Sequence, residues 1–184
     1  KMLENIYNAL KAEERKVALL DIEENLLRIL IDAEQKDKYV QVLKKLGWRQ
    51  QKDISKDLYL YGMDHFLYFV MEDVKLVVCC QLACRSTLNG EWVPLDRKIN
   101  NFALERVVME QDTVMPVPVA EDLLCYLLAK CVYTKESFSK EDIARIENCM
   151  KQVKEPQLSD KLEGVFFYFT NTILEMVKKG QYDD

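Results

Sequence analysis

The sequence has little glycine and proline, no long apolar run and only one histidine. Its 5 glycines and 4 prolines are too few for a fibrous or low-complexity chain of 184 residues. No stretch approaches the ~18 consecutive apolar residues that a membrane-spanning helix needs, and no basic-then-apolar leader is visible. We therefore expect one globular domain in the cytoplasm, with no membrane partner.

Cysteine and histidine lack the spacings that metal or redox chemistry needs. No two of the 6 cysteines are separated by two residues, and His65 is the single histidine that could complete a metal site or a nucleophilic triad. The cysteines fall inside apolar segments, which predicts buried free thiols in a reducing compartment. They are Cys79, Cys80, Cys84, Cys125, Cys131 and Cys149.

The balance of charge is mildly acidic. With 26 basic and 31 acidic side chains the net charge is −5. An acidic excess opposes attraction to phosphate backbones, so we expect no general nucleic-acid binding.

The glycines are scattered along the chain and form no glycine-rich phosphate loop.

The first part of the chain alternates between helical and strand patterns. Apolar residues at helical spacing predict helices over 2–15 and 35–46, the second of which ends at Gly47. Short apolar runs predict the strands, with the polar residues 21–25 separating the first two. The predicted strands are 17–20, 26–31, 57–63, 65–71, 75–85 and 104–110, with a short helix over 96–102.

After Pro118 every periodic segment is helical. We predict helices over 119–133 and 158–179, and a helix between them that Ser139 caps. The predicted class is α+β, with a mixed, mainly antiparallel sheet and flanking helices over 1–114. A C-terminal three-helix region over 115–184 follows and packs with the sheet as one compact unit.

Three segments carry a family resemblance. The first is Leu43-Lys44-Lys45-Leu46-Gly47-Trp48, and the later ones are 118–124 with Ala129-Lys130, and Lys140-Glu141-Asp142-Ile143. They resemble the nucleotidyltransferase superfamily, in particular its small abortive-infection-type members. The resemblance implies a nucleotidyltransferase-like fold whose helical tail turns Lys130, Lys140 and Asp142 toward a nucleotide. Lys130 also stands out by itself, because a lysine inside an apolar helix either extends to solvent or faces a polar cleft.

The resemblance also implies a magnesium site, which needs carboxylates that converge on the ion. The family places an Asp-x-Asp pair on one strand and a third Asp on a later strand. Here the corresponding positions hold Leu26 and Arg28, and no acid lies between Lys75 and Arg85. The only local substitute is Asp21-Ile22-Glu23, which lies ahead of that strand. With Asp32, these acids are the remaining catalytic candidates, and we expect them to be turn and strand-end residues instead.

The sequence therefore favours a nucleotidyltransferase-like domain without catalysis and without a metal cofactor. It would bind a nucleotide, another phosphorylated small molecule or a protein partner. Two alternatives remain open. One is an interaction or dimerisation module, in which the C-terminal helices and the run Phe166-Phe167-Tyr168-Phe169 form the contact surface. The other is an active enzyme that uses Asp21 and Glu23 with Mg²⁺.

Overall fold

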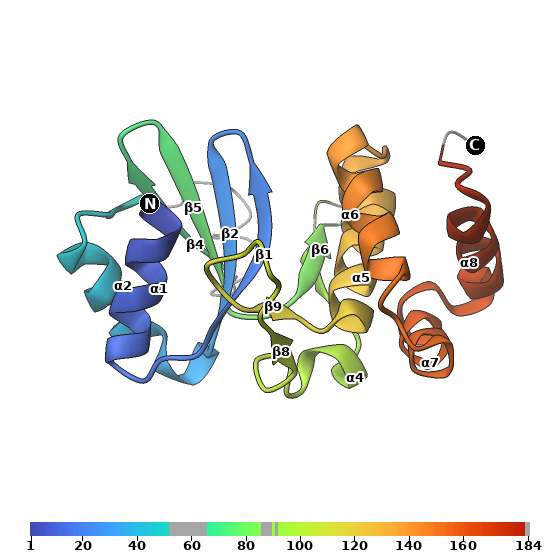
Figure 1. The fold of residues 1–184 in the computed structure, drawn as a ribbon, viewed down its shortest axis with the longest axis horizontal. Coiled ribbons are helices and arrows are strands. Elements are labelled where there is room, and N and C mark those ends of the chain that lie inside the picture. Colours follow the sequence, from blue (N-terminus) through green and yellow to red (C-terminus); the bar gives the residue numbers. More distant parts are fainter. Residues whose placement is uncertain (52–65, 86–89, 91, 183–184) are drawn as a thin grey trace. The chain divides into compact units, whose positions relative to one another are not determined.

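The structure, a computed structural model, describes residues 1–51, 66–85, 90 and 92–182. The chain divides into two compact units, and each is described by itself (Figure 1). The sheet unit comprises Lys1–Gln81 and Leu104–Pro118, and the helical unit comprises Leu82–Ala103 and Val119–Asp184. The segment 82–103 was expected to belong with the sheet and instead groups with the C-terminal helices.

A five-stranded sheet forms the centre of the sheet unit. Its strands lie in the order β1-β2-β5-β4-β3. β2 and β5 are parallel, and the other three neighbouring pairs are antiparallel. The predicted α+β class with a mixed, mainly antiparallel sheet is thus confirmed. The strands are β1 (Val17–Glu23), β2 (Leu26–Ile31), β3 (Arg49–Gln51), β4 (Phe66–Met71) and β5 (Val74–Cys79).

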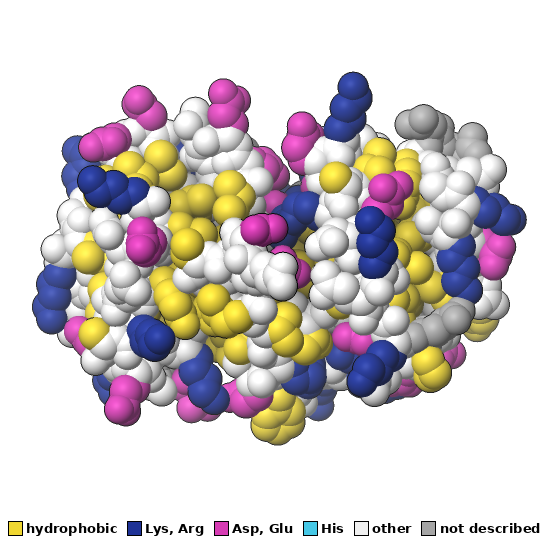
Figure 2. Space-filling view, in the orientation of Figure 1, with side chains coloured by type: hydrophobic (Ala, Val, Ile, Leu, Met, Phe, Trp, Pro, Cys, Tyr) yellow, Lys and Arg dark blue, Asp and Glu magenta, His cyan; other side chains and the backbone are white. Residues whose placement is uncertain are grey.

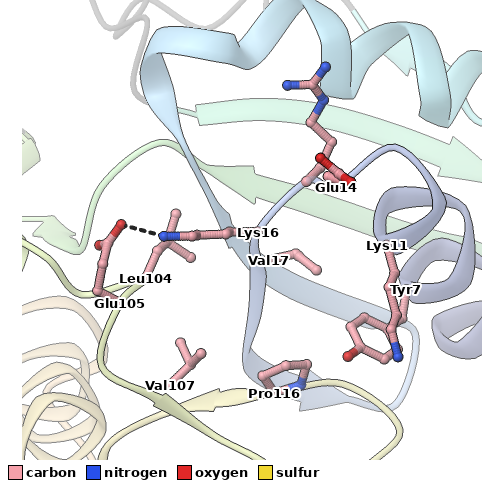
Figure 3. Close-up of a pocket in the computed structure, with 10 residues that line it drawn as sticks. Tyr7, Lys11, Glu14, Lys16, Val17, Leu104, Glu105, Val107 and Pro116 are labelled. Atoms are coloured by element: carbon pink, nitrogen blue, oxygen red, sulfur yellow. Dashed lines mark hydrogen bonds and ion pairs between the residues drawn. The ribbon is translucent and has the colours of Figure 1, made fainter.

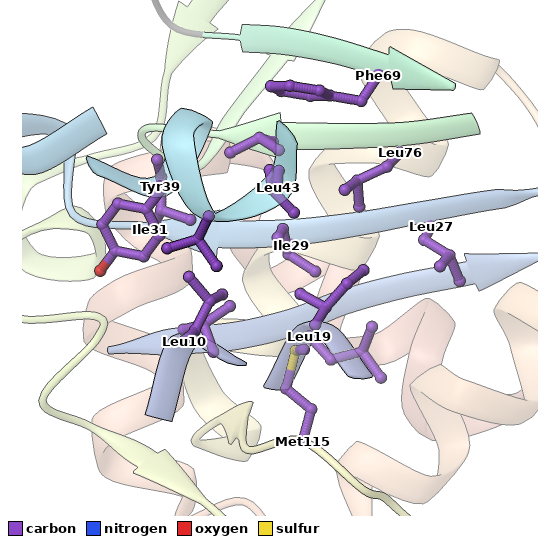
Figure 4. Close-up of a cluster of buried hydrophobic side chains, with 14 of the residues drawn as sticks. Leu10, Leu19, Leu27, Ile29, Ile31, Tyr39, Leu43, Phe69, Leu76 and Met115 are labelled. Carbon is purple, nitrogen blue, oxygen red and sulfur yellow. The ribbon is translucent and has the colours of Figure 1, made fainter. Parts of the chain in front are cut away.

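One face of this sheet is covered by α1 (Met2–Ala12) and α2 (Lys36–Lys45). Apolar side chains of both helices are buried against every second residue of the strands, because alternate residues of a strand point to the same face. Figure 4 shows this cluster, with Leu10, Tyr39, Leu43, Ile29 and Leu76 among its members. The other alternate residues, Arg28 among them, therefore point to the opposite face.

A short ribbon completes the sheet unit. β8 (Val107–Val108) pairs with β9 (Val117–Pro118), and the backbone N–H of Leu19 in β1 donates to the carbonyl of Pro116 over 2.7 Å. Met115 is fully buried in the same core (Figure 4). This late segment of the chain is thereby fixed beside the first strand.

The helical unit is built around α5 (Ala120–Ala129), which is buried over nearly its whole length and packs against two other helices. A π-helix, η2 (Lys130–Lys135), continues α5 directly. The remaining elements are β6 (Ala83–Arg85), β7 (Trp92–Pro94), α4 (Arg97–Asn100), α6 (Lys140–Met150), α7 (Glu155–Phe166), the 3-10 turn η3 (Phe167–Phe169) and α8 (Thr170–Lys179).

β1 is longer than the sequence predicted. Asp21 and Glu23, which were expected to lie in a turn after the strand, belong to β1, and only Glu24 and Asn25 form the turn. Asp21 pairs with Arg28 across the hairpin. A cross-strand pair of opposite charges stabilises the hairpin, so the polar residues remain in the strand.

The predicted helix over 158–179 was wrong, because two helices occupy this segment. The break is at Phe167, whose φ of 48° and ψ of −116° cannot continue a helix. The predicted strand 75–85 is likewise divided into β5 and β6, and 104–110 contains only the two residues of β8. The predicted strand 57–63 and His65 lie outside the described residues.

The state of the cysteines and the distribution of surface charge are as the composition predicted. All six cysteines are free thiols, and five of them are buried, as predicted, while Cys80 is partly exposed. Figure 2 shows acidic and basic side chains interspersed over the visible face. Among the described residues, no helix has the length and apolar character needed to cross a membrane.

Candidate functional site

A row of paired residues crosses all five strands of the sheet. It runs from Asp21 in β1 through Arg28 in β2, Val77 in β5 and Tyr68 in β4 to Gln51 in β3. Directly paired residues point to the same face of a sheet. Since Arg28 points away from α1 and α2, this five-strand row lies on the face opposite those helices. It combines an ion pair, an aromatic ring and an amide.

Arg28 is the centre of an ion cluster at one end of this row. Its guanidinium Nη1 donates to Asp21 Oδ2 over 3.1 Å and to Glu23 Oε1 over 3.0 Å. The Asp21 side chain is only 3% exposed and that of Arg28 23%, whereas Glu23 is 43% exposed. The cluster therefore joins a shielded ion pair to a second carboxylate that water reaches, and it carries one net negative charge.

The magnesium site implied by the resemblance does not fit this cluster. Mg²⁺ needs oxygen ligands at about 2.1 Å, and here both carboxylates accept hydrogen bonds from a cation that repels a metal ion. Asp32, the third candidate, lies about 13 Å farther along the strand direction from Arg28. Its carboxylate instead accepts from the backbone N–H of Glu34 and caps the 3-10 turn η1 (Ala33–Gln35). Within the ranges that the structure describes, no group of three potential metal ligands comes together.

In the helical unit, Asp142 of α6 accepts hydrogen bonds from two lysines. Lys130 Nζ lies 2.9 Å from Asp142 Oδ1, and Lys135 donates to the other oxygen. Ser139 completes the capping box predicted for α6, and its hydroxyl donates to Asp142 Oδ2 over 2.8 Å. Of the three residues singled out in the sequence, Lys130 and Asp142 are thus brought together. Lys140 is exposed at the first residue of α6.

The Asp142 carboxyl is held in its charged form. Burial opposes ionisation, but the hydrogen bonds from Lys135, Lys130 and Ser139 outweigh it and hold the pKa of Asp142 well below its ordinary range. The lysine cluster of Lys130, Lys135 and Asp142 therefore joins two lysine side chains to one charged carboxylate. Lys130 is almost fully buried, whereas the side chain of Lys135 is 31% exposed.

The buried thiols contribute no nucleophile to either unit. Burial raises the pKa of Cys131, which lies in η2, to about 12, and the nearby Asp142 carboxylate adds to this shift. Burial likewise raises the pKa of Cys79 in β5 to about 12. Both thiols are protonated at neutral pH, and a protonated thiol is a poor nucleophile.

The sheet unit also contains an open cavity of about 420 Å³. Figure 3 shows Tyr7, Val17 and Pro116 on its walls, with Lys16 and Glu105 paired over 2.8 Å at one side. The cavity adjoins Val17 at the beginning of β1, about 13 Å along the strand from Asp21. It is therefore separate from the five-strand row.

Two residues of these sites, Lys135 and Gln51, were not singled out in the sequence. Lys135 reaches Asp142 because the π-helix η2 has more residues per turn than an α-helix. No local sequence pattern predicts this π-helix. Tyr68 and Gln51 join Arg28 only through the strand register. Tyr68 had an indirect signal, since it belongs to the aromatic segment expected as a strand.

Two solved structures resemble the fold of the whole chain. A solution structure of the antibiotic-resistance factor ANT(2'')-Ia has a TM-score of 0.58 and 9% sequence identity, over 98% of this chain and 96% of that one. A crystal structure of ANT(2'')-Ia in complex with adenylyl-2''-tobramycin has a TM-score of 0.55 and 9% identity, over 85% of this chain and 90% of that one. No family model matches the chain, and no curated protein matches it in sequence. At such low identity the likeness establishes the fold alone.

Proposed function

We propose, from the premise that this chain has a nucleotidyltransferase-like fold, that it is a non-catalytic domain that binds a nucleotide or another phosphorylated small molecule without magnesium. One observation carries the proposal. On the sheet face opposite α1 and α2, the Arg28 guanidinium donates to both Asp21 and Glu23. The acid pair Asp21-Ile22-Glu23 is thereby engaged by a cation of the protein itself.

The absence of catalysis follows from the charges that nucleotidyl transfer needs. Metal ions stabilise the negative charge that develops on the phosphates and orient the attacking and leaving oxygens. The described strands β2 and β5 contain no carboxylate at all. Arg28 cannot replace the metal, because its charge is already balanced by two carboxylates. Transfer of a nucleotidyl group would therefore lack its main source of transition-state stabilisation.

The lysine cluster supports an anionic, phosphorylated ligand. Two lysines converge on the carboxylate of Asp142, so cationic side chains are concentrated at this point of the helical unit. Hydrogen bonds between a lysine and a phosphate are charge-assisted and stronger than neutral ones. ANT(2'')-Ia, which has a similar fold, has been crystallised with an adenylylated compound. We propose that this chain binds a ligand of that phosphorylated kind but does not synthesise it.

Isothermal titration calorimetry in EDTA tests this proposal. The probes are inorganic phosphate and nucleoside mono-, di- and triphosphates. We expect at least one nucleotide to bind, and Lys135→Ala to weaken that binding about tenfold, which corresponds to one charged hydrogen bond. Lys151→Ala, which removes an exposed lysine at the C-terminal cap of α6, is the matched control. No binding by any probe, or equal loss in both variants, would contradict the proposal.

An active enzyme that uses Asp21 and Glu23 with Mg²⁺ is the alternative. It would require Arg28 to leave both carboxylates when the metal binds. Because Asp21 is buried, that movement would have to open the hairpin or replace its side-chain partners. Magnesium dependence of ligand binding distinguishes the two functions and is considered in the Discussion.

A further inference from the structure

Three consecutive aromatic side chains between α7 and α8 are exposed. Phe167 is 70% exposed, Tyr168 100% and Phe169 67%. Aromatic side chains bury about 150–250 Å² each when they are covered, so this aromatic triplet leaves a large apolar area in water. Scattered exposed apolar residues are ordinary, but a contiguous group indicates an interaction site.

The triplet is held in place and does not belong to a loose loop. The preceding residue, Phe166, is buried and stacks on Tyr133 with ring centroids 5.5 Å apart. On the other side, the buried hydroxyl of Thr170 donates to the Phe167 carbonyl over 2.7 Å. The backbone on both sides of the triplet is therefore anchored, and aromatic side chains, with only two rotatable bonds each, lose little conformational entropy when they bind.

The backbone of the triplet is also strained. Phe167 has a φ of 48°, a region that residues with a bulky side chain rarely adopt. Such a conformation costs on the order of 1–3 kcal/mol and persists where the surrounding structure enforces it. The contacts of Phe166 and Thr170 on either side thus maintain a strained backbone conformation in a segment whose aromatic rings are exposed.

A groove lies on the helix that follows the triplet. It has a volume of about 480 Å³ and is lined by Asn171, Thr172, Glu175, Met176 and Gln181. The Met176 thioether can contact an aromatic ring favourably. The amide, hydroxyl and carboxylate groups around it can bond the phenol of a tyrosine. The chemistry of this α8 groove therefore complements an aromatic group that contains a tyrosine hydroxyl.

We propose that the chain forms a homodimer in which the aromatic triplet of one copy lies in the α8 groove of the other. Both halves of the contact occur on the segment 167–181, so a twofold axis makes both contacts at once. Because the six side chains of the two triplets are about four-fifths exposed on average, covering them would bury on the order of 700–1,200 Å², near the lower limit for specific interfaces. Small interfaces of this kind are typical of weak, transient complexes, and we therefore expect a dimer that dissociates at micromolar concentrations. This inference is independent of the phosphorylated ligand.

Sedimentation equilibrium from low to high micromolar protein tests the dimer. We expect the mass to rise with concentration from 21.6 kDa toward twice that value. Tyr168→Ser, which alters the triplet, and Met176→Lys, which alters the groove, should each raise the dissociation constant about tenfold or more. A mass that stays monomeric at every concentration would overturn the proposal, as would a dimer that both variants leave intact.

Two further variants separate association from folding. Phe167→Gly removes one ring and permits the positive φ, so it should weaken the dimer while the melting temperature of the monomer is kept or raised. Phe102→Ser is the matched control, because Phe102 is also 70% exposed and also has a positive φ, 63°, but lies outside the triplet. A dimer lost in Phe102→Ser and kept in Phe167→Gly would place the interface elsewhere and contradict the proposal.

Discussion

Arg28 and Asp21 face each other across the hairpin of β1 and β2, with guanidinium Nη1 3.1 Å from carboxylate Oδ2. Asp21 is buried and Arg28 is largely so, and the pair is therefore shielded from bulk water. A positive charge supplied by the protein thus occupies the neighbourhood in which the family resemblance implies a metal ion. The proposed loss of catalysis rests on this ion pair.

The first prediction concerns the stability that Arg28 contributes. Arg28→Leu should lower the free energy of unfolding by about 2 kcal/mol, because the buried Asp21 carboxylate loses a charged hydrogen bond. Arg28→Lys should restore part of it. Urea unfolding measures the change, and Arg49→Leu, at an exposed position of β3, is the control. Equal stability of the wild type and Arg28→Leu would show that the pair has no structural role.

The second prediction concerns Asp142 and pH. Asp142→Asn should destabilise the protein by about 3–5 kcal/mol at neutral pH, because the buried Lys130 loses its carboxylate partner. The folded-state pKa of Asp142 lies below its unfolded value. Its contribution is therefore complete above the unfolded pKa of about 3.9 and is lost as the pH falls further. The difference between the two proteins should shrink below about pH 4, and a constant difference would contradict this account.

Local patterns in the sequence predict most elements but not the contacts between charged groups. The core positions of α1, α2 and β2 follow from helical and alternating spacing. The pairing of Asp21 with Arg28 depends on a register shift between Leu19 and Asp21, which no local pattern indicates. The break between α7 and α8 at Phe167 could not be predicted either, because the helical spacing of apolar residues continues through it.

The same limit applies to the candidate site in the helical unit. Lys130 and Asp142 were singled out by the family resemblance, and Lys130 also by its position in an apolar helix, which is a local signal. The second lysine at Asp142 is Lys135, and its position results from the π-helix between them. A sequence pattern that assumes a regular α-helix would place Lys135 elsewhere. Lys140 was expected only because the family resemblance implied it.

The third prediction concerns the packing of α4 on α7. A Cβ atom added to Gly164 would lie 2.8 Å from Cβ and Cγ of Asp96, the residue that caps α4. In an exposed helix Gly→Ala stabilises by about 1 kcal/mol. Gly164→Ala should instead lower the free energy of unfolding by about 1–3 kcal/mol, because the cap must move. Glu163→Ala is the neighbouring control, and stabilisation by Gly164→Ala would show that Asp96 does not crowd this position.

The fourth prediction concerns thiol reactivity. Cys80 is partly exposed, whereas the other five cysteines are buried, and burial raises the pKa of Cys79 and Cys131 to about 12. Alkylation of the native protein at pH 8 should therefore modify Cys80 first. The buried thiols should react only after unfolding, which mass spectrometry of digested protein would reveal. Rapid native labelling of Cys131 would contradict its burial beside Asp142.

The central claim is tested most directly by the magnesium dependence of nucleotide affinity. Calorimetric titrations of wild type and Asp21→Ala with one nucleoside triphosphate are compared in excess Mg²⁺ and in EDTA. We predict that the wild type binds at least as tightly in EDTA, since the lysines attract the uncomplexed and more negative nucleotide. An affinity about tenfold higher in Mg²⁺, with this gain abolished in Asp21→Ala, would establish a metal site at the Arg28 cluster and contradict the account.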